Sequence, residues 1–204
     1  MQKSRYGKFF KDNNFEKIVD PDGDRVFKVT IPIDDEGENT VVVIGKAPKP
    51  SSEEKGNDIR RAIKYLLSNK EVFGSIKQVD FVFLFPVIEY TKDALEEILN
   101  RKGELFLAGN EGIWNNDEFI KNDLVIFEEM IDYNHIIFAW GQPSKDLKPI
   151  YENRIQYLLK GFKLIKNNAN EVKKTYVVGG LTNNGYPRQY TSWNRELHLV
   201  EYNI

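Results

Sequence analysis

Two kinds of hydrophobic pattern alternate along the chain. Mostly apolar runs of strand length cover residues 40–45, 78–86, 135–141 and 174–180. Stretches with apolar residues at helical spacing cover residues 51–67, 91–99, 116–133 and 149–162. The Gly-containing stretch 101–116 predicts an irregular connection. Buried strands that alternate with amphipathic helices predict an α/β protein: a three-layer, mainly parallel central sheet with helices on both faces.

The two ends of the chain predict additional strands. Residues 24–33 alternate polar and apolar positions, and a polar turn at 34–39 separates them from the run at 40–45. This pattern predicts an N-terminal antiparallel hairpin-like pair, with one strand half-buried and one fully buried. Residues 195–202 predict a short edge strand. A length of 204 residues predicts a single domain spanning 1–204, with residues 1–20 as a peripheral N-terminal segment.

Composition narrows the classes of partner and cofactor. The 29 Lys and Arg residues nearly balance 31 Asp and Glu residues, for a net charge of −2, which argues against a long nucleic-acid duplex. The chain has no cysteine and two histidines, which argues against disulfides, zinc–thiolate sites and multi-histidine metal sites. It has no apolar run of membrane-spanning length and no signal-peptide pattern at its start. We therefore predict a cytoplasmic protein with no metal or other cofactor and no membrane contact.

The loops that follow the four apolar runs share a composition. Each combines Gly or Pro with polar residues, and the four are 45–52, 85–91, 140–146 and 179–193. Because the carboxyl ends of parallel strands meet at one edge of a sheet, these loops are expected to lie together there. Ligands of open α/β sheets bind at that edge. The sequence therefore predicts a ligand site built from these loops.

The first loop combines cations, hydroxyls and a predicted helix start. Lys46 and Lys49 precede Ser51 and Ser52, and Glu54 has capping-box spacing from Ser51. A helix N-terminus offers free N–H groups and a positive dipole end, which suit a phosphate or a carboxylate. The alternative is that a serine only caps the helix while the lysines are solvated. The glycines and the Gly-Lys-Ser order of a P-loop are missing.

The predicted helix at 51–67 carries three charged candidates. Asp58 is followed by Arg60 and Arg61, and consecutive helical residues point about 100° apart. One arginine can therefore face the strand ends while the other lies on the surface. The alternative is that all three form a solvated helix face.

Trp140 and Gly141 end an apolar run. An aromatic ring at the carboxyl end of a strand can stack on a base or another flat ring, and glycine permits close approach of a ligand. The tryptophan can equally plug the edge of the sheet.

The last loop places Tyr186, Arg188, Gln189 and Tyr190 close together. The arginine supplies a fork for phosphate or carboxylate, the glutamine a donor and an acceptor for a base edge, and the tyrosines stacking surfaces. The alternative is a C-terminal loop packed by its own aromatic residues.

Acid–base candidates are few. Asp58 and Glu89 are carboxylates near the predicted edge, whereas His135 and His198 fit structural or exposed positions. No Ser-His-Asp or Cys-His set can be assembled. Residues 111–116 favour either a binding loop or a plain connector.

The four loops together resemble an uncharacterised bacterial and phage family, domain of unknown function 1643. The corresponding motifs here are "KAPKPSS", "DIRRAI", "FLFP", "IIFAWG" followed by Arg154, and "GLTNNGYPRQY", and they span residues 40–202. The chain departs from the family pattern at Lys49, Phe83 and Gln189, where the family has Asn, Asn and His. A more distant likeness, to uracil-DNA glycosylases, rests on architecture, which does not carry function.

These observations predict a pocket for a nucleotide-like or phosphate-bearing small ligand at the carboxyl edge of the sheet. Loss of the family's Asn and His favours a non-catalytic protein that sequesters such a ligand. One alternative is a hydrolase or glycosylase acting on a nucleobase or nucleoside bond, with Asp58 or Glu89 positioning water. Another is a protein-interaction module. The sequence leaves formation of a homodimer open.

Overall fold

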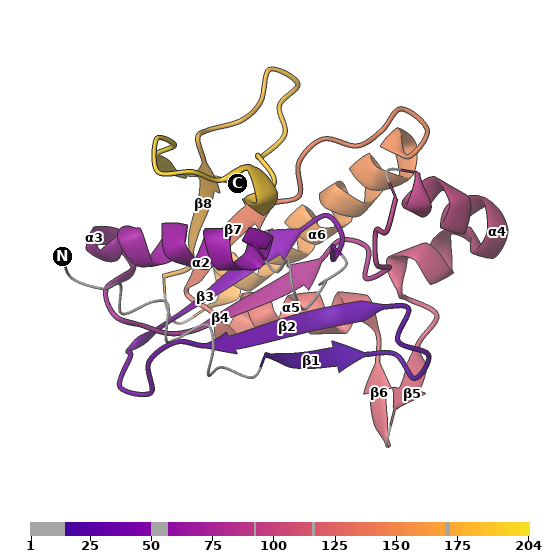
Figure 1. The fold of residues 1–204 in the computed structure, drawn as a ribbon, viewed down its shortest axis with the longest axis horizontal. Coiled ribbons are helices and arrows are strands. Elements are labelled where there is room, and N and C mark those ends of the chain that lie inside the picture. The colour runs from indigo at the N-terminus through magenta and orange to yellow at the C-terminus, as the bar shows by residue number, and fades with distance from the viewer. Residues whose placement is uncertain (1–14, 50–56, 92, 116, 170–171) are drawn as a thin grey trace.

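The main feature of the computed structural model is a seven-stranded mixed sheet (Figure 1). The structure describes residues 15–49, 57–91, 93–115, 117–169 and 172–204. The strands of the sheet are β1 (Glu16–Val19), β2 (Val26–Pro32), β3 (Asn39–Gly45), β4 (Ile76–Phe83), β7 (His135–Ala139), β8 (Lys174–Val178) and β9 (Leu199–Glu201). Their order is β1-β2-β4-β3-β7-β8-β9. The central four, β4, β3, β7 and β8, are parallel, and β1, β2 and β9 are antiparallel to their neighbours.

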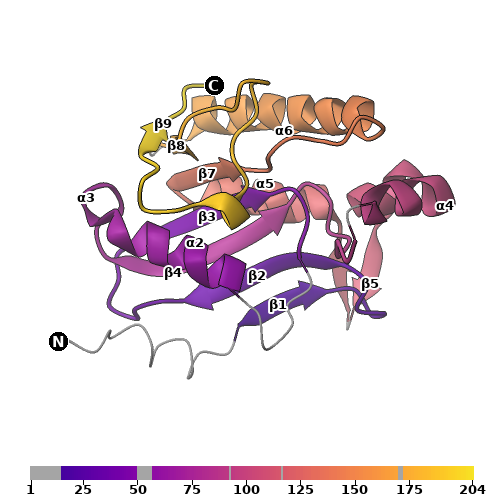
Figure 2. The same ribbon diagram turned by 45° about the horizontal axis from the view of Figure 1, so that its top comes forward.

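Helices cover both faces of this sheet (Figure 2). They are α2 (Asn57–Ser68), α3 (Lys70–Phe73), α4 (Ala94–Ala108), α5 (Asn122–Asp132) and α6 (Lys148–Asn168). The apolar residues of α2 and α3 pack on one face, and those of α4, α5 and α6 belong to the core on the other. The predicted three-layer α/β architecture is therefore confirmed.

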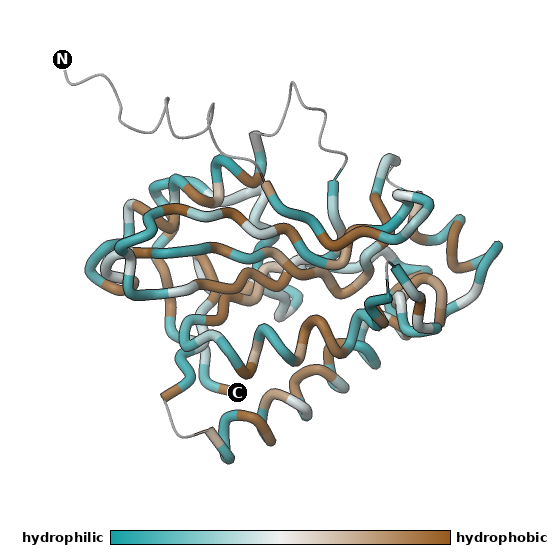
Figure 3. Tube along the Cα trace, turned by 90° about the horizontal axis from the view of Figure 1, so that it is seen from below, coloured by the Kyte–Doolittle hydropathy of each residue, from teal (hydrophilic) through white to brown (hydrophobic). Residues whose placement is uncertain are grey.

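The alternation of side chains along a strand explains why the central strands carry apolar residues on both faces of the sheet. In β3, Val41 and Val43 face the α2 layer, and Val42 and Ile44 face the α5 and α6 layer. Figure 3 shows apolar residues running along the strands and alternating with polar residues on the helices. Each face of the sheet thus buries its own core.

The predicted pairing of 24–33 with 40–45 is wrong. β2 and β3 are not neighbours, because β4 lies between them and pairs with both. The turn between them packs instead on the chain that enters β4, with Glu38 N–H donating to Ser75 O at 3.1 Å. The N-terminal antiparallel hairpin exists, but β1 and β2 form it. A turn in the sequence predicts that the chain reverses direction. It does not predict whether a third strand lies between the two strands that the turn connects.

The prediction of an irregular stretch at 101–116 is also wrong. α4 continues to Ala108 across a kink at Gly103 (φ 84°, ψ 175°), and a small hairpin of β5 (Ile113–Asn115) and β6 (Glu118–Ile120) follows. The predicted helix at 116–133 starts only at Asn122. β9 confirms the predicted edge strand, whereas β1 was not predicted. Within the described ranges, no helix combines the length and the apolar character needed to cross a membrane.

Candidate functional site

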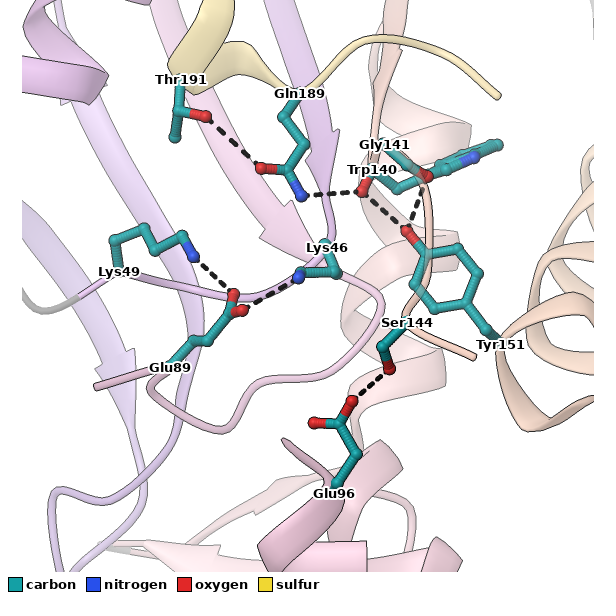
Figure 4. Close-up of polar contacts among 10 residues, drawn as sticks. All are labelled: Lys46, Lys49, Glu89, Glu96, Trp140, Gly141, Ser144, Tyr151, Gln189 and Thr191. Atoms are coloured by element: carbon teal, nitrogen blue, oxygen red, sulfur yellow. Dashed lines mark hydrogen bonds and ion pairs between the residues drawn. The ribbon is translucent and has the colours of Figure 1, made fainter. Parts of the chain in front are cut away.

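The segments that follow β3 and β4 run side by side at the carboxyl edge of the sheet. Phe85 N–H donates to Lys46 O at 2.9 Å, and Glu89 N–H donates to Pro48 O at 2.9 Å. These backbone bonds fix the two loops to each other beyond the last residues of the strands. The segment after β7 and part of the C-terminal loop approach the same edge (Figure 4).

Glu89 joins the two lysines of the first loop. Lys46 Nζ lies 2.9 Å from Glu89 Oε1, and Lys49 Nζ lies 2.7 Å from Glu89 Oε2 (Figure 4). The Glu89 side chain is 4% exposed, that of Lys46 15%, and that of Lys49 35%. A carboxylate this buried needs ionic partners to offset its desolvation. Two ammonium groups on one carboxylate leave one surplus positive charge, which reaches solvent through Lys49.

The side chain of Gln189 lies directly over Gly141. The Gln189 amide N–H donates weakly to Trp140 O at 3.5 Å, and Thr191 Oγ1 donates to Gln189 Oε1 at 3.4 Å. Gly141 has φ +70°, and a Cβ added there would lie 2.3 Å from Gln189 Cγ. The close approach that Gly141 permits is therefore to Gln189 of the same chain.

Two of the three predicted stacking residues are buried. The Trp140 ring is 2% exposed and lies 4.7 Å from that of Phe138, which corresponds to the alternative role of plugging the sheet edge. Tyr190, at the start of the short 3₁₀ helix η1 (Tyr190–Ser192), packs against Phe81 at 5.3 Å. Burial raises the pKa of Tyr190, and the negative charges of Asp58 and Glu89 raise that pKa further.

Tyr186 is half-buried at the surface. Its hydroxyl donates to Glu152 Oε1 at 2.7 Å, and this bond raises the pKa of Tyr186 to about 12. Of the three predicted stacking residues, this ring is the most accessible.

The arginines of α2 and of the C-terminal loop have different surroundings. Arg61 is exposed, donates to Thr191 O at 2.7 Å and lies 3.7 Å from Asp58, so it ties α2 to η1. Arg60 is half-buried on the same helix. Arg188 makes one weak bond, from Nε to Gly179 O at 3.5 Å. Across the described ranges, no carboxylate lies within ion-pair distance of Arg188, so its positive charge is available to a ligand.

The arrangement offers little acid–base chemistry. Each oxygen of Glu89 is paired with an ammonium group and the side chain is 4% exposed, so Glu89 is placed as a counter-ion of the lysines. Asp58 is partly exposed and faces Arg61. His135 lies at the amino end of β7, and burial followed by the charge of Lys174 lowers its pKa. Among the described residues, no group of three or more His, Asp or Glu side chains could hold a metal ion.

Three residues that support this edge were not among the predicted site residues. Arg154 Nε donates to Leu84 O at 2.6 Å, and Asn122 Nδ2 donates to the same carbonyl at 3.2 Å. The Tyr151 hydroxyl donates to Trp140 O at 2.6 Å. These bonds fix the chain where it leaves β4 and β7. A polar residue in the apolar stripe of a helix is the sequence signal that marks Arg154 and Asn122 as buried hydrogen-bonding groups.

A hollow of about 620 Å³ opens at the opposite, amino edge, between the last turns of α5 and α6. Ile131, Leu164 and Lys173 are among its lining residues. The Lys173 ammonium donates to the carbonyls of Ile131 and Tyr133, the latter at 3.2 Å. The predicted site residues that the structure describes do not line this hollow.

Comparison of the chain with protein-family models, curated proteins and solved structures gives no significant match. The likenesses to domain of unknown function 1643 and to uracil-DNA glycosylases therefore stay predictions. Ser51 and Ser52 lie outside the described residues. The protein is therefore an open-sheet α/β protein whose sheet carries positively charged side chains at its carboxyl edge, and we call this region the cationic edge.

Proposed function

We propose that this protein binds a small, phosphate-bearing, nucleotide-like ligand at the carboxyl edge of its sheet and sequesters it without chemical change. The observation that supports this most is the pairing of Lys46 and Lys49 with the single buried carboxylate of Glu89. The carboxylate holds both ammonium groups in place and neutralises only one of them. Such a fixed surplus charge binds an anion at a smaller ordering cost than two free lysines would.

Arg188 adds a second cation to the proposed site. With it, the surplus at the edge becomes two positive charges, which matches a phosphate monoester near neutral pH. The planar guanidinium suits two phosphate oxygens. Tyr186 and Gln189, on the same segment, would contact the remainder of the ligand. The adjoining positions Ser51 and Ser52 belong to the same proposal through the sequence alone.

A thermal-shift screen at low salt tests this proposal. The panel holds nucleoside mono-, di- and cyclic phosphates, nucleosides and inorganic phosphate. A ligand at one hundred times its dissociation constant adds about 2.7 kcal/mol of stability. We expect shifts with phosphate-bearing compounds, none with nucleosides, and losses in Lys49→Ala and Arg188→Ala. The control Lys70→Ala, an exposed lysine of α3, keeps the shift. Equal shifts for nucleosides and nucleotides would refute the anion site.

The hydrolase alternative makes a different prediction for Glu89. If Glu89 positions water, Glu89→Gln abolishes turnover of the ligand that the screen identifies. If Glu89 instead holds the lysines in place, Glu89→Gln leaves them less ordered and weakens binding of phosphate compounds, and neither the wild type nor the variant converts the ligand. Mass spectrometry of the ligand after incubation with wild type and Glu89→Gln separates the two. Conversion by the wild type would refute sequestration.

A further inference from the structure

The hairpin of β5 and β6 exposes a pair of aromatic rings. Trp114 pairs with Phe119 across the two strands, and their ring centroids lie 5.2 Å apart. Trp114 is 68% exposed and Phe119 47%. Figure 1 shows this hairpin extending away from the body of the protein. The solvent-facing side of an antiparallel pair usually carries polar residues, so two adjacent exposed rings indicate an interaction surface.

The base of the hairpin is anchored to the body, which holds the rings in place. Ile120, on the opposite side of the hairpin from the rings, is buried in the core. At the base, Arg25 Nη1 forms an ion pair with Glu111 Oε1 at 3.1 Å, and nearer the tip Asn115 Nδ2 donates to Val19 O at 3.0 Å. The Phe119 ring lies on Gly112, where an added Cβ would be 2.6 Å from it. A preorganised aromatic pair loses little conformational entropy when a partner covers it.

The charges beside the rings indicate the chemistry of the partner. Asp117 and Glu118 stand next to Phe119 at the tip of the hairpin, and both are exposed. Within the described ranges, neither carboxylate has an ion-pair partner. The only cation in the sequence 109–123 is Lys121. The tip therefore favours cations, which can also lie on the face of Trp114.

From these observations we propose that the β5–β6 hairpin is a docking site for another protein, through a basic segment whose Lys or Arg residues alternate with apolar ones. The apolar residues cover Trp114 and Phe119, and the cations pair with Asp117 and Glu118. Aromatic anchors of this kind dominate binding energies at protein interfaces, while charges at the rim set specificity. The residues of this surface differ from Lys46, Lys49 and Glu89 of the cationic edge.

Intrinsic fluorescence gives a selective readout of this surface. The chain has three tryptophans, and Trp140 and Trp193 are 2% and 0% exposed. Quenching by acrylamide therefore reports mainly on Trp114. Peptides are first selected from a random display library on the immobilised full chain, and those that also bind Trp114→Ala are removed. Synthetic copies of the remaining peptides are then titrated while quenching is followed.

We expect the selected peptides to be rich in Lys or Arg interspersed with apolar residues, and to protect Trp114 from acrylamide. Phe119→Ala weakens their binding about tenfold, and Asp117→Asn with Glu118→Gln weakens it about threefold. The control Val200→Ser, an exposed apolar residue of β9, leaves binding unchanged. Selected peptides without basic residues, or none that depend on Trp114, would overturn the proposal. Self-association in sedimentation that Trp114→Ala abolishes would assign the surface to a second copy and also overturn it.

Discussion

Glu129 illustrates how one buried residue sets a property of the whole fold. It lies on α5, and its Oε1 is 2.8 Å from Lys28 Nζ of β2. The same ammonium is 3.8 Å from Asp80 of β4, which is fully buried and accepts a hydrogen bond from the Tyr133 hydroxyl. Two carboxylates thus share one lysine. Burial raises the pKa of Glu129 to about 7, the Lys28 hydrogen bond opposes this, and the charge of Asp80 adds to it.

This raised pKa predicts the sign of a pH dependence. Between the unfolded value of 4.5 and the folded value of about 7, the folded state binds more protons at Glu129 than the unfolded state does. Its contribution to the free energy of unfolding is therefore largest at low pH and falls as pH rises through 7. The full difference is on the order of 3 kcal/mol. Urea unfolding from pH 4.5 to 7.5 measures it.

The variant Glu129→Gln isolates this effect, because it should lose the decrease in the free energy of unfolding that Glu129 causes as pH rises. Glu128→Gln, one residue earlier and exposed, keeps the wild-type slope. His135, whose pKa is lowered, contributes with the opposite sign in the same range, but it is present in all three proteins. Equal slopes in Glu129→Gln and wild type would contradict the assignment.

At the scale of elements, the C-terminal loop packs closely on the chain that leaves β7. Gly141 and Gly180 both have positive φ, +70° and +67°, but their surroundings differ. A Cβ at Gly141 would meet Gln189 at 2.3 Å, whereas a Cβ at Gly180 has nothing within 4 Å. An L-residue placed at either position would therefore have a strained backbone, but only at Gly141 would its side chain also clash with Gln189.

Replacement of each glycine by alanine separates these two contributions. Gly180→Ala should lower the free energy of unfolding by about 1–2 kcal/mol, the strain alone. Gly141→Ala should lower it by a further 1–3 kcal/mol, roughly the cost of overpacking. In the Gln189→Ala background the further loss should vanish, as a double-mutant cycle by chemical denaturation can measure. Persistence of the further loss in that background would show that Gln189 is not the neighbour that matters.

Prediction from sequence worked best for the strands that are buried on both faces. The strands β3, β4, β7 and β8 have apolar residues at consecutive positions because both faces of the sheet are covered, and this marks a central parallel sheet. It failed for the hairpin of β5 and β6, whose strands are three residues long, too short for any period to appear. It also failed at Gly103, where the chain kinks without ending α4.

For the candidate site, sequence reasoning placed Lys46, Lys49 and Arg188 at one edge because strand ends meet there. The shared partner of the two lysines could not be derived in the same way. Glu89 lies forty residues beyond Lys49, and only the packing of the two loops brings them together. Likewise, Trp140 is buried in a core to which several elements contribute, and no local pattern reveals this.

At the scale of the whole molecule, the central claim is that anions bind at the carboxyl edge and not at the hollow between α5 and α6. Backbone amide shifts followed by two-dimensional NMR, during titration with a nucleoside monophosphate and with its nucleoside, locate any binding directly. The account predicts that the monophosphate perturbs the amides of Lys46, Lys49, Glu89 and Arg188, and that the nucleoside perturbs them far less. Perturbations centred on Ile131 and Leu164, or none with any phosphate compound, would contradict it.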